Sequence, residues 1–68
     1  MTVQVTLNGE PRELPAGSTI AQAVAELTAA PSGVAAAVNG DVVPRGSWGF
    51  TVLRDGDQVE VVTAVQGG

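Results

Sequence analysis

The carboxylate of Gly68 has the clearest chemical potential in this sequence. The chain ends in Gln66-Gly67-Gly68, and glycine leaves a terminal carboxylate free to lie extended in a narrow groove. Such a group is ionised at neutral pH and can attack a nucleotide phosphate when a partner supplies a metal ion and cationic groups. Gly-Gly by itself is a weak signal, because taken alone it is more often a frayed end or an expression scar than a functional terminus.

Other reactive groups are scarce. The chain has no Cys, no His and no Lys, which excludes thiol and imidazole nucleophiles, Schiff-base lysines and histidine metal sites. Asp55 and Asp57 flank Gly56 and could suggest a cation site. A turn favours the same residue types, however, and two carboxylates are too few for a calcium loop. We therefore expect no metal site and no self-contained enzyme.

Charge and length narrow the choice of partners and of architecture. The net charge is −4, and the only basic residues are Arg12, Arg45 and Arg54, which argues against nucleic acid. No apolar run approaches the roughly 20 residues of a membrane span, and the start does not resemble a secretory signal, so we expect a cytoplasmic protein without a membrane partner. The 68 residues predict one domain, at 1–65, followed by a flexible tail at 66–68.

The first elements that must position the tail form a hairpin. Residues 2–7 alternate between polar and apolar, Asn8-Gly9 predicts a tight turn, and residues 10–14 return antiparallel. Pro11 cannot donate to a ladder, so the second strand is predicted at an edge of the sheet. The register of a two-residue turn places Arg12 on the apolar side, with its methylenes along the rim and its head in water.

A helix is predicted next. Ile20, Val24 and Leu27 are spaced at i, i+4 and i+7, which indicates one apolar stripe. Thr19 and Gln22 have the spacing of a capping box at its start.

A second hairpin follows the helix. Residues 34–38 form a short apolar run that predicts a strand buried on both faces. Asn39-Gly40 repeats the turn signal, and residues 42–43 return until Pro44 ends the strand.

The last part of the domain contains both aromatic residues and a final strand. We expect Trp48 and Phe50 to pin their segment to the core. Residues 58–65 alternate as a strand, with Val62 and Ala64 on the face opposite the helix. Single exposed apolar residues are normal, but two of them beside the tail could form a partner-docking patch. One helix crossing a mixed sheet of four to five strands makes an α+β roll.

Several of these segments together resemble a known family. Residues 34–45 (VAAAVNGDVVPR), Trp48, Asp55-Gly56-Asp57 and the final Gln66-Gly67-Gly68 are similar to the thiamine-biosynthesis sulfur carrier family (ThiS). The resemblance covers the whole chain, and its most specific pieces are the Asn-Gly-x-Val-Val-Pro-Arg-x-x-Trp stretch, the Asp-Gly-Asp turn and the end. It implies a ubiquitin-like β-grasp fold.

The resemblance also implies a cycle of reactions at Gly68. An E1-like adenylyltransferase (ThiF-type) would use ATP and Mg²⁺ to adenylate this carboxylate, with Gly67 and Gln66 threading into its channel. A persulfide sulfur donor would convert it to a thiocarboxylate, and thiazole synthase (ThiG-type) would take the sulfur for the thiazole ring of thiamine. The chain itself would be no enzyme and would hold no permanent cofactor.

Three alternatives remain open at this point. A sulfur carrier for molybdopterin, cysteine or a secondary metabolite would differ only in its acceptor enzyme. A protein modifier would end in an isopeptide bond to a target lysine. In a regulatory binding module the Gly-Gly would be incidental, and deleting Gly67 and Gly68 would leave function intact.

Overall fold

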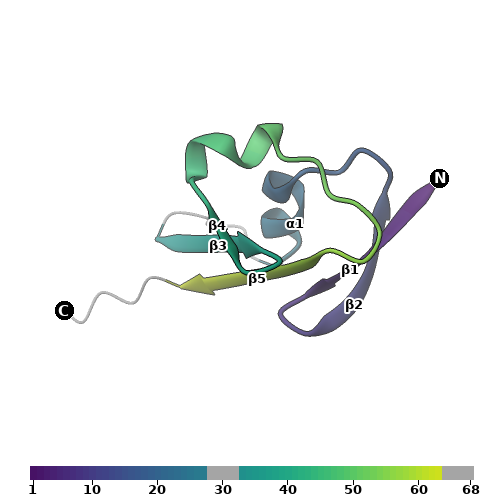
Figure 1. The fold of residues 1–68 in the computed structure, drawn as a ribbon, viewed down its shortest axis with the longest axis horizontal. Helices are drawn as coiled ribbons and strands as arrows, with labels where there is room; N and C mark the ends of the chain where they lie inside the picture. The colour runs from purple at the N-terminus through teal and green to yellow at the C-terminus, as the bar shows by residue number, and fades with distance from the viewer. Residues whose placement is uncertain (28–32, 64–68) are drawn as a thin grey trace.

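A five-stranded sheet and one α-helix organise the structure, a computed structural model that describes residues 1–27 and 33–63. The order along the chain is β1 (Thr2–Leu7), β2 (Glu10–Pro15), α1 (Ile20–Leu27), β3 (Val34–Val38), β4 (Asp41–Val43), the 3₁₀ helix η1 (Arg45–Phe50) and β5 (Gln58–Thr63). The helix and η1 lie on the same side of β5 (Figure 1). The predicted boundary between domain and tail falls outside the described residues.

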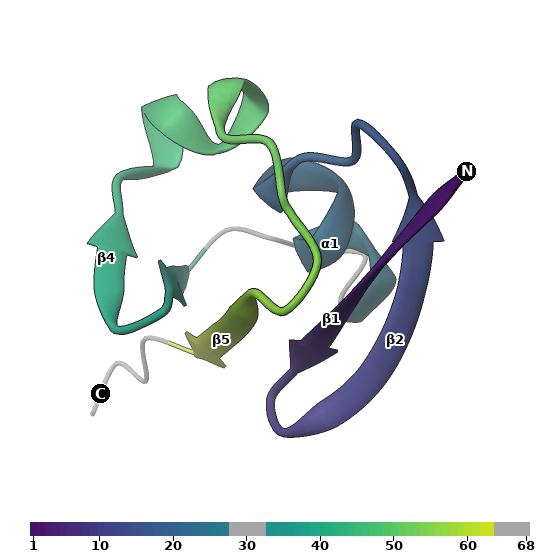
Figure 2. The ribbon, with the colours of Figure 1, turned by 45° about the vertical axis from the view of Figure 1, so that its right-hand side comes forward.

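The last strand occupies the middle of the sheet. The strand order is β2-β1-β5-β3-β4, with β5 parallel to β1 and antiparallel to β3. Figure 2 shows β2 and β4 at opposite sides of this sheet. The mixed sheet with one helix confirms the predicted α+β roll.

The first hairpin has the predicted turn and register. Asn8 and Gly9 have φ of 51° and 84°, the positive values that a type I′ turn requires. Leu7 pairs with Glu10, and the pairing continues to Thr2 opposite Pro15. Every second residue of β2 points its main-chain N–H and C=O away from β1, and Pro11 and Pro15 occupy two of these positions. The edge prediction is confirmed, and the prolines leave this edge with fewer free donors for another strand.

Arg12 lies at the rim of the helix-side face, as predicted. It is opposite Val5 and half-buried. Its Nη1 atom is 3.4 Å from Oε1 of Glu26 on α1, so the guanidinium head pairs across the rim with the helix.

The helix packs through the predicted stripe. Ile20 and Val24 are buried and Leu27 is half-buried. The N–H of Thr19 donates to Oε1 of Gln22 at 2.8 Å, which is one of the two bonds of a capping box. Within the described ranges, no helix is long and apolar enough to cross a membrane. The buried apolar residues are Val5, Leu7, Leu14, Ile20, Ala23, Val24, Ala36, Trp48, Leu53 and Val59.

The prediction that residues 34–38 are buried on both faces was wrong. Ala36 is buried beneath the helix layer, but Ala35, on the other face, is exposed. The described elements that cover the sheet, α1 and η1, lie on one side of it (Figure 1), which leaves the opposite face open.

The prediction for Phe50 was also wrong. Trp48 is buried, and its Nε1–H donates to the carbonyl of Val43 at 2.9 Å. Phe50 is 85% exposed. A 3₁₀ helix has three residues per turn, so two side chains that are two positions apart point in different directions. Only one of them can face the core.

Candidate functional site

β5 is the strand that leads to the C-terminal residues. On one side it pairs with β3 along its length, from Val59 opposite Val38 to Thr63 opposite Val34. On the other side it pairs with β1 only at its start. Gly68, Gly67, Gln66 and Ala64 lie outside the described residues, so the geometry of the candidate site is that of the strand before them.

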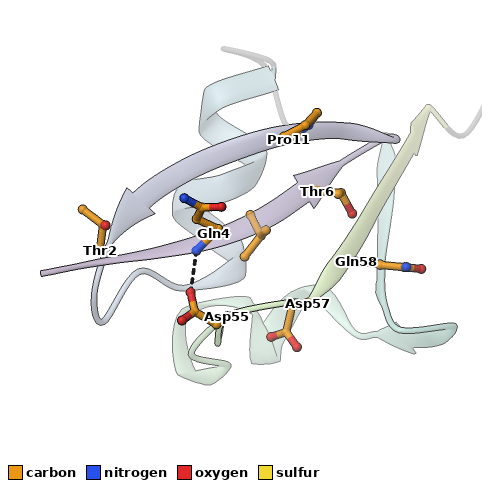
Figure 3. A pocket seen from close by; sticks show the side chains of 9 residues that line it. Thr2, Gln4, Thr6, Pro11, Asp55, Asp57 and Gln58 are labelled. Atoms are coloured by element: carbon orange, nitrogen blue, oxygen red, sulfur yellow. Dashed lines mark hydrogen bonds between the residues drawn. The ribbon is translucent and has the colours of Figure 1, made fainter.

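The Asp-Gly-Asp turn fixes the start of β5 against β1. The N–H of Gln4 donates to Oδ1 of Asp55 at 2.7 Å (Figure 3), and the N–H of Gly56 donates to the carbonyl of Gln4 at 2.7 Å. The N–H of Thr6 donates to the carbonyl of Asp57 at 3.0 Å. The turn therefore continues the parallel ladder of β1 before β5 begins, with a carboxylate standing in for one backbone carbonyl.

Asp57 joins this turn to the second hairpin. Its Oδ2 accepts the N–H of Arg54 at 2.8 Å, and its Oδ1 accepts from Nδ2 of Asn39 at 3.0 Å. The Oδ1 atom of Asn39 in turn accepts the N–H of Gln58 at 3.0 Å. Both carboxylates of the turn thus bind groups of the chain itself. Across residues 1–27 and 33–63, no cluster of three or more His, Cys, Asp or Glu residues could hold a metal ion.

A groove of about 540 Å³, lined mostly by residues with polar side chains, lies beside this turn (Figure 3). It is lined by Thr2, Gln4, Val5, Thr6, Pro11, Asp55, Gly56, Asp57 and Gln58. A threonine hydroxyl needs an adjacent base to become a nucleophile, whereas the two carboxylates here accept hydrogen bonds from other groups. Among the described residues that line the groove, both carboxylates thus hold other groups of the chain in place.

The open face of the sheet carries an apolar patch near the end of β5. Val62 is 60% exposed and lies opposite Ala35, and Val42 is 75% exposed and lies opposite Ala37. These four residues, hereafter the outer patch, surround a hollow of about 120 Å³ together with Ala36 and Glu60. The predicted docking residue Val62 therefore lies on the face opposite the helix, next to the strand end.

Sequence reasoning missed three members of the outer patch: Ala35, Ala37 and Val42. A signal for them was present, because a two-residue turn at Asn39-Gly40 places Ala37 opposite Val42. The expectation that the third strand is buried on both faces concealed it.

Comparison with known proteins gives a consistent family. The family model described as the ThiS family matches residues 5–68. The chain is 30% identical over 66 residues to the sulfur carrier protein ThiS of Escherichia coli. This match covers 97% of this chain and 100% of that protein. A crystal structure of the thiamine biosynthesis protein ThiS from Geobacter metallireducens superposes with a TM-score of 0.76 at 28% identity, and the match covers 97% of this chain and 100% of that one.

A second kind of relative is much longer. The chain is 42% identical over 66 residues to a thiazole synthase of Magnetococcus marinus. The match covers 97% of this chain but only 20% of that protein, so the chain spans about a fifth of its length.

Proposed function

Since the chain belongs to the ThiS family, we propose that it carries sulfur for the thiazole moiety of thiamine as a thiocarboxylate on Gly68. The observation that carries the proposal is the reach of the family match, which runs to residue 68 and so includes Gly67 and Gly68. Similarity over the full length of a named sulfur carrier supports it.

The first step activates the terminal carboxylate. One of its oxygens attacks the α-phosphorus of ATP, and pyrophosphate leaves, which produces an acyl adenylate. A ThiF-type adenylyltransferase supplies the Mg²⁺ and the cationic groups that stabilise this transfer. The requirement for ATP supports a cytoplasmic location for this cycle.

The second step exchanges oxygen for sulfur. The terminal sulfur of a cysteine persulfide attacks the acyl carbon, and AMP leaves with one of the original carboxylate oxygens. A thiol then cleaves the S–S bond of the resulting acyl disulfide, which leaves the thiocarboxylate on Gly68 and a new disulfide on the donor side. The chain has no Cys and no Lys, so none of its side chains competes as a thiol or amine for the activated acyl group.

The acceptor of the sulfur is a ThiG-type thiazole synthase. The similarity to a segment of a thiazole synthase supports this choice over an acceptor from the molybdopterin or cysteine pathways. The outer patch provides an apolar surface beside β5 on which such a partner can dock while the tail enters its channel. In this cycle the catalytic groups belong to the partners, and the chain is a substrate that passes between them.

Removal of the two C-terminal glycines tests the proposal. The shortened chain ends in a carboxylate on Gln66, about 7 Å short of the original position in an extended tail. With the cognate adenylyltransferase, ATP and Mg²⁺, we expect ATP–pyrophosphate exchange with the full chain and none with the shortened one. A Gly46→Ala chain with an intact tail serves as the control. Equal exchange with the shortened chain would contradict the role of Gly68 as the modified residue, and no exchange with the full chain, by an enzyme shown to be active on a control carrier, would favour a binding module.

A further inference from the structure

The side chain of Asn8 makes two hydrogen bonds to the main chain of Val61. Its Nδ2 donates to the carbonyl of Val61 at 3.1 Å, and its Oδ1 accepts the N–H of Val61 at 2.8 Å. The main-chain N–H of Asn8 also donates to the carbonyl of Val59 at 2.9 Å. A residue of the first turn thus contacts β5 at two successive positions on one edge.

These bonds begin where the ladder between β1 and β5 ends. The last paired residues are Leu7 and Val59, because β1 turns away at Asn8-Gly9. The carboxamide has one acceptor and an NH₂ donor, the same functions as a peptide unit. It therefore occupies the place that the next residue of β1 would have in the ladder and satisfies the groups of Val61 on that edge.

The turn alone does not require asparagine at position 8. Its φ of 51° is a value that glycine adopts with less strain, and Gly-Gly is also a favoured pair in type I′ turns. What glycine cannot supply is the carboxamide that reaches Val61. The two side-chain bonds are thus separable from the turn.

We propose that Asn8 is a positioning residue for the transfer at Gly68. It holds β5 at Val61, two residues before the strand ends at Thr63, and so fixes the direction in which the chain leaves the sheet. This inference rests on the proposed function. In a variant without the carboxamide, only β3 holds the end of β5. The strand end then has more conformational freedom, and part of that freedom must be lost when the tail binds a partner.

Asn39 provides a matched control. It occupies the same position in the second Asn-Gly turn, with φ of 52°, and its side chain also makes two bonds. Those bonds go to Asp57 and Gln58, at the start of β5 rather than at its end. Asn8→Gly and Asn39→Gly therefore remove the same chemistry from opposite ends of one strand.

The test combines amide hydrogen exchange with adenylation kinetics on the full chain. For Asn8→Gly we expect the protection factor of the Val61 N–H to fall about tenfold, equivalent to about 1.4 kcal/mol. We also expect the KM for adenylation to rise about three- to tenfold with kcat unchanged. The reason is that the free-energy cost of ordering the end of β5 falls on the binding step and not on the chemical step. Asn39→Gly should leave KM unchanged, and Asn8→Asp, which keeps the acceptor for the Val61 N–H, should be intermediate.

Two results would overturn the inference: unchanged protection of Val61 in Asn8→Gly, or equal rises in KM for the two glycine variants. Failure of the proposed function looks different, because the unaltered chain would then not be adenylated at all, whereas the exchange of Val61 reports on the Asn8 bonds independently.

Discussion

Asp57 uses its two carboxylate oxygens to bind two parts of the chain. One oxygen accepts the N–H of Arg54 within its own turn, and the other accepts the side-chain amide of Asn39 from the second hairpin. Asp57 therefore holds its own turn against the second hairpin at the point where β5 starts, one residue later.

Asp57→Ala should lower the free energy of unfolding by about 1–3 kcal/mol, because two donors lose a charged acceptor. Asp57→Asn, which keeps one carbonyl oxygen, should lose less. Urea unfolding followed by tryptophan fluorescence measures both. Glu26→Ala is the control: its exposed pair with Arg12 should contribute no more than about 0.5 kcal/mol, and a larger effect there than at Asp57 would contradict this assignment.

Glycine is needed at position 56 for its backbone conformation rather than for space. Its φ is +87°, and a Cβ built there would meet nothing within 4 Å. Gly56→Ala should therefore cost about 1–2 kcal/mol of unfolding free energy through backbone strain alone. Gly46 in η1 is equally open but has no positive φ, so Gly46→Ala should be neutral or stabilise by up to about 1 kcal/mol. Equal effects in thermal unfolding would show that strain is not the cause.

At the scale of elements, the outer patch joins three neighbouring strands, β4, β3 and β5. The patch is apolar, open to solvent and adjacent to the strand that leads to the tail. Single exposed valines are ordinary, but a group of apolar side chains around a hollow is the arrangement expected at the centre of a protein–protein contact.

Val62→Asp tests the patch without disturbing the core. We expect an unchanged unfolding free energy and a rise of about tenfold in the KM for the adenylyltransferase or thiazole synthase, since a charge is then buried on docking. Val52→Asp is a matched control, because Val52 is 53% exposed and lies after η1, paired with Thr19 rather than lining the hollow. Equal effects of the two variants in steady-state kinetics would remove the outer patch from the docking surface.

Elements that are marked by a short sequence motif, such as a turn or a cap, could be predicted from the sequence. Features that depend on contacts between residues far apart in the chain could not. The two Asn-Gly turns fix the registers of their hairpins, and the capping pair marks the start of α1. The parallel pairing of β5 with β1 has no local signal, because it joins residues about 50 positions apart. The outward direction of Phe50 depends on how η1 packs, which its composition does not reveal.

The candidate site divides in the same way. The resemblance at Gly68 could be seen in the sequence, but no pattern indicated that Asn8 would reach Val61, since a side-chain bond across the sheet depends on the strand order. The outer patch was predicted only in part. The alternation of residues 58–65 placed Val62 on the face opposite the helix, whereas Ala35 and Val42 could be assigned to the patch only once this face was known to be open.

In the described part of the chain, the sheet has one covered face and one open face. The helix and η1 lie over one face (Figure 1), while the other face presents the outer patch and the groove beside the Asp-Gly-Asp turn. A domain of this size supports only a modest core, and the described part of this one places a single polar side chain, Ser18, among its buried residues. This arrangement agrees with the proposed function, in which the chain is handed between enzymes.

Intact mass spectrometry tests the central claim most directly. The chain is incubated with its cognate adenylyltransferase, ATP, Mg²⁺ and a persulfide source, beside a sample without ATP. We predict an ATP-dependent gain of about 16 Da, the exchange of one oxygen for sulfur. Oxidation of Met1 adds nearly the same mass, so fragmentation must locate the change on Gly68. An unmodified terminus, with enzymes shown to be active on a control carrier, would contradict the carrier function.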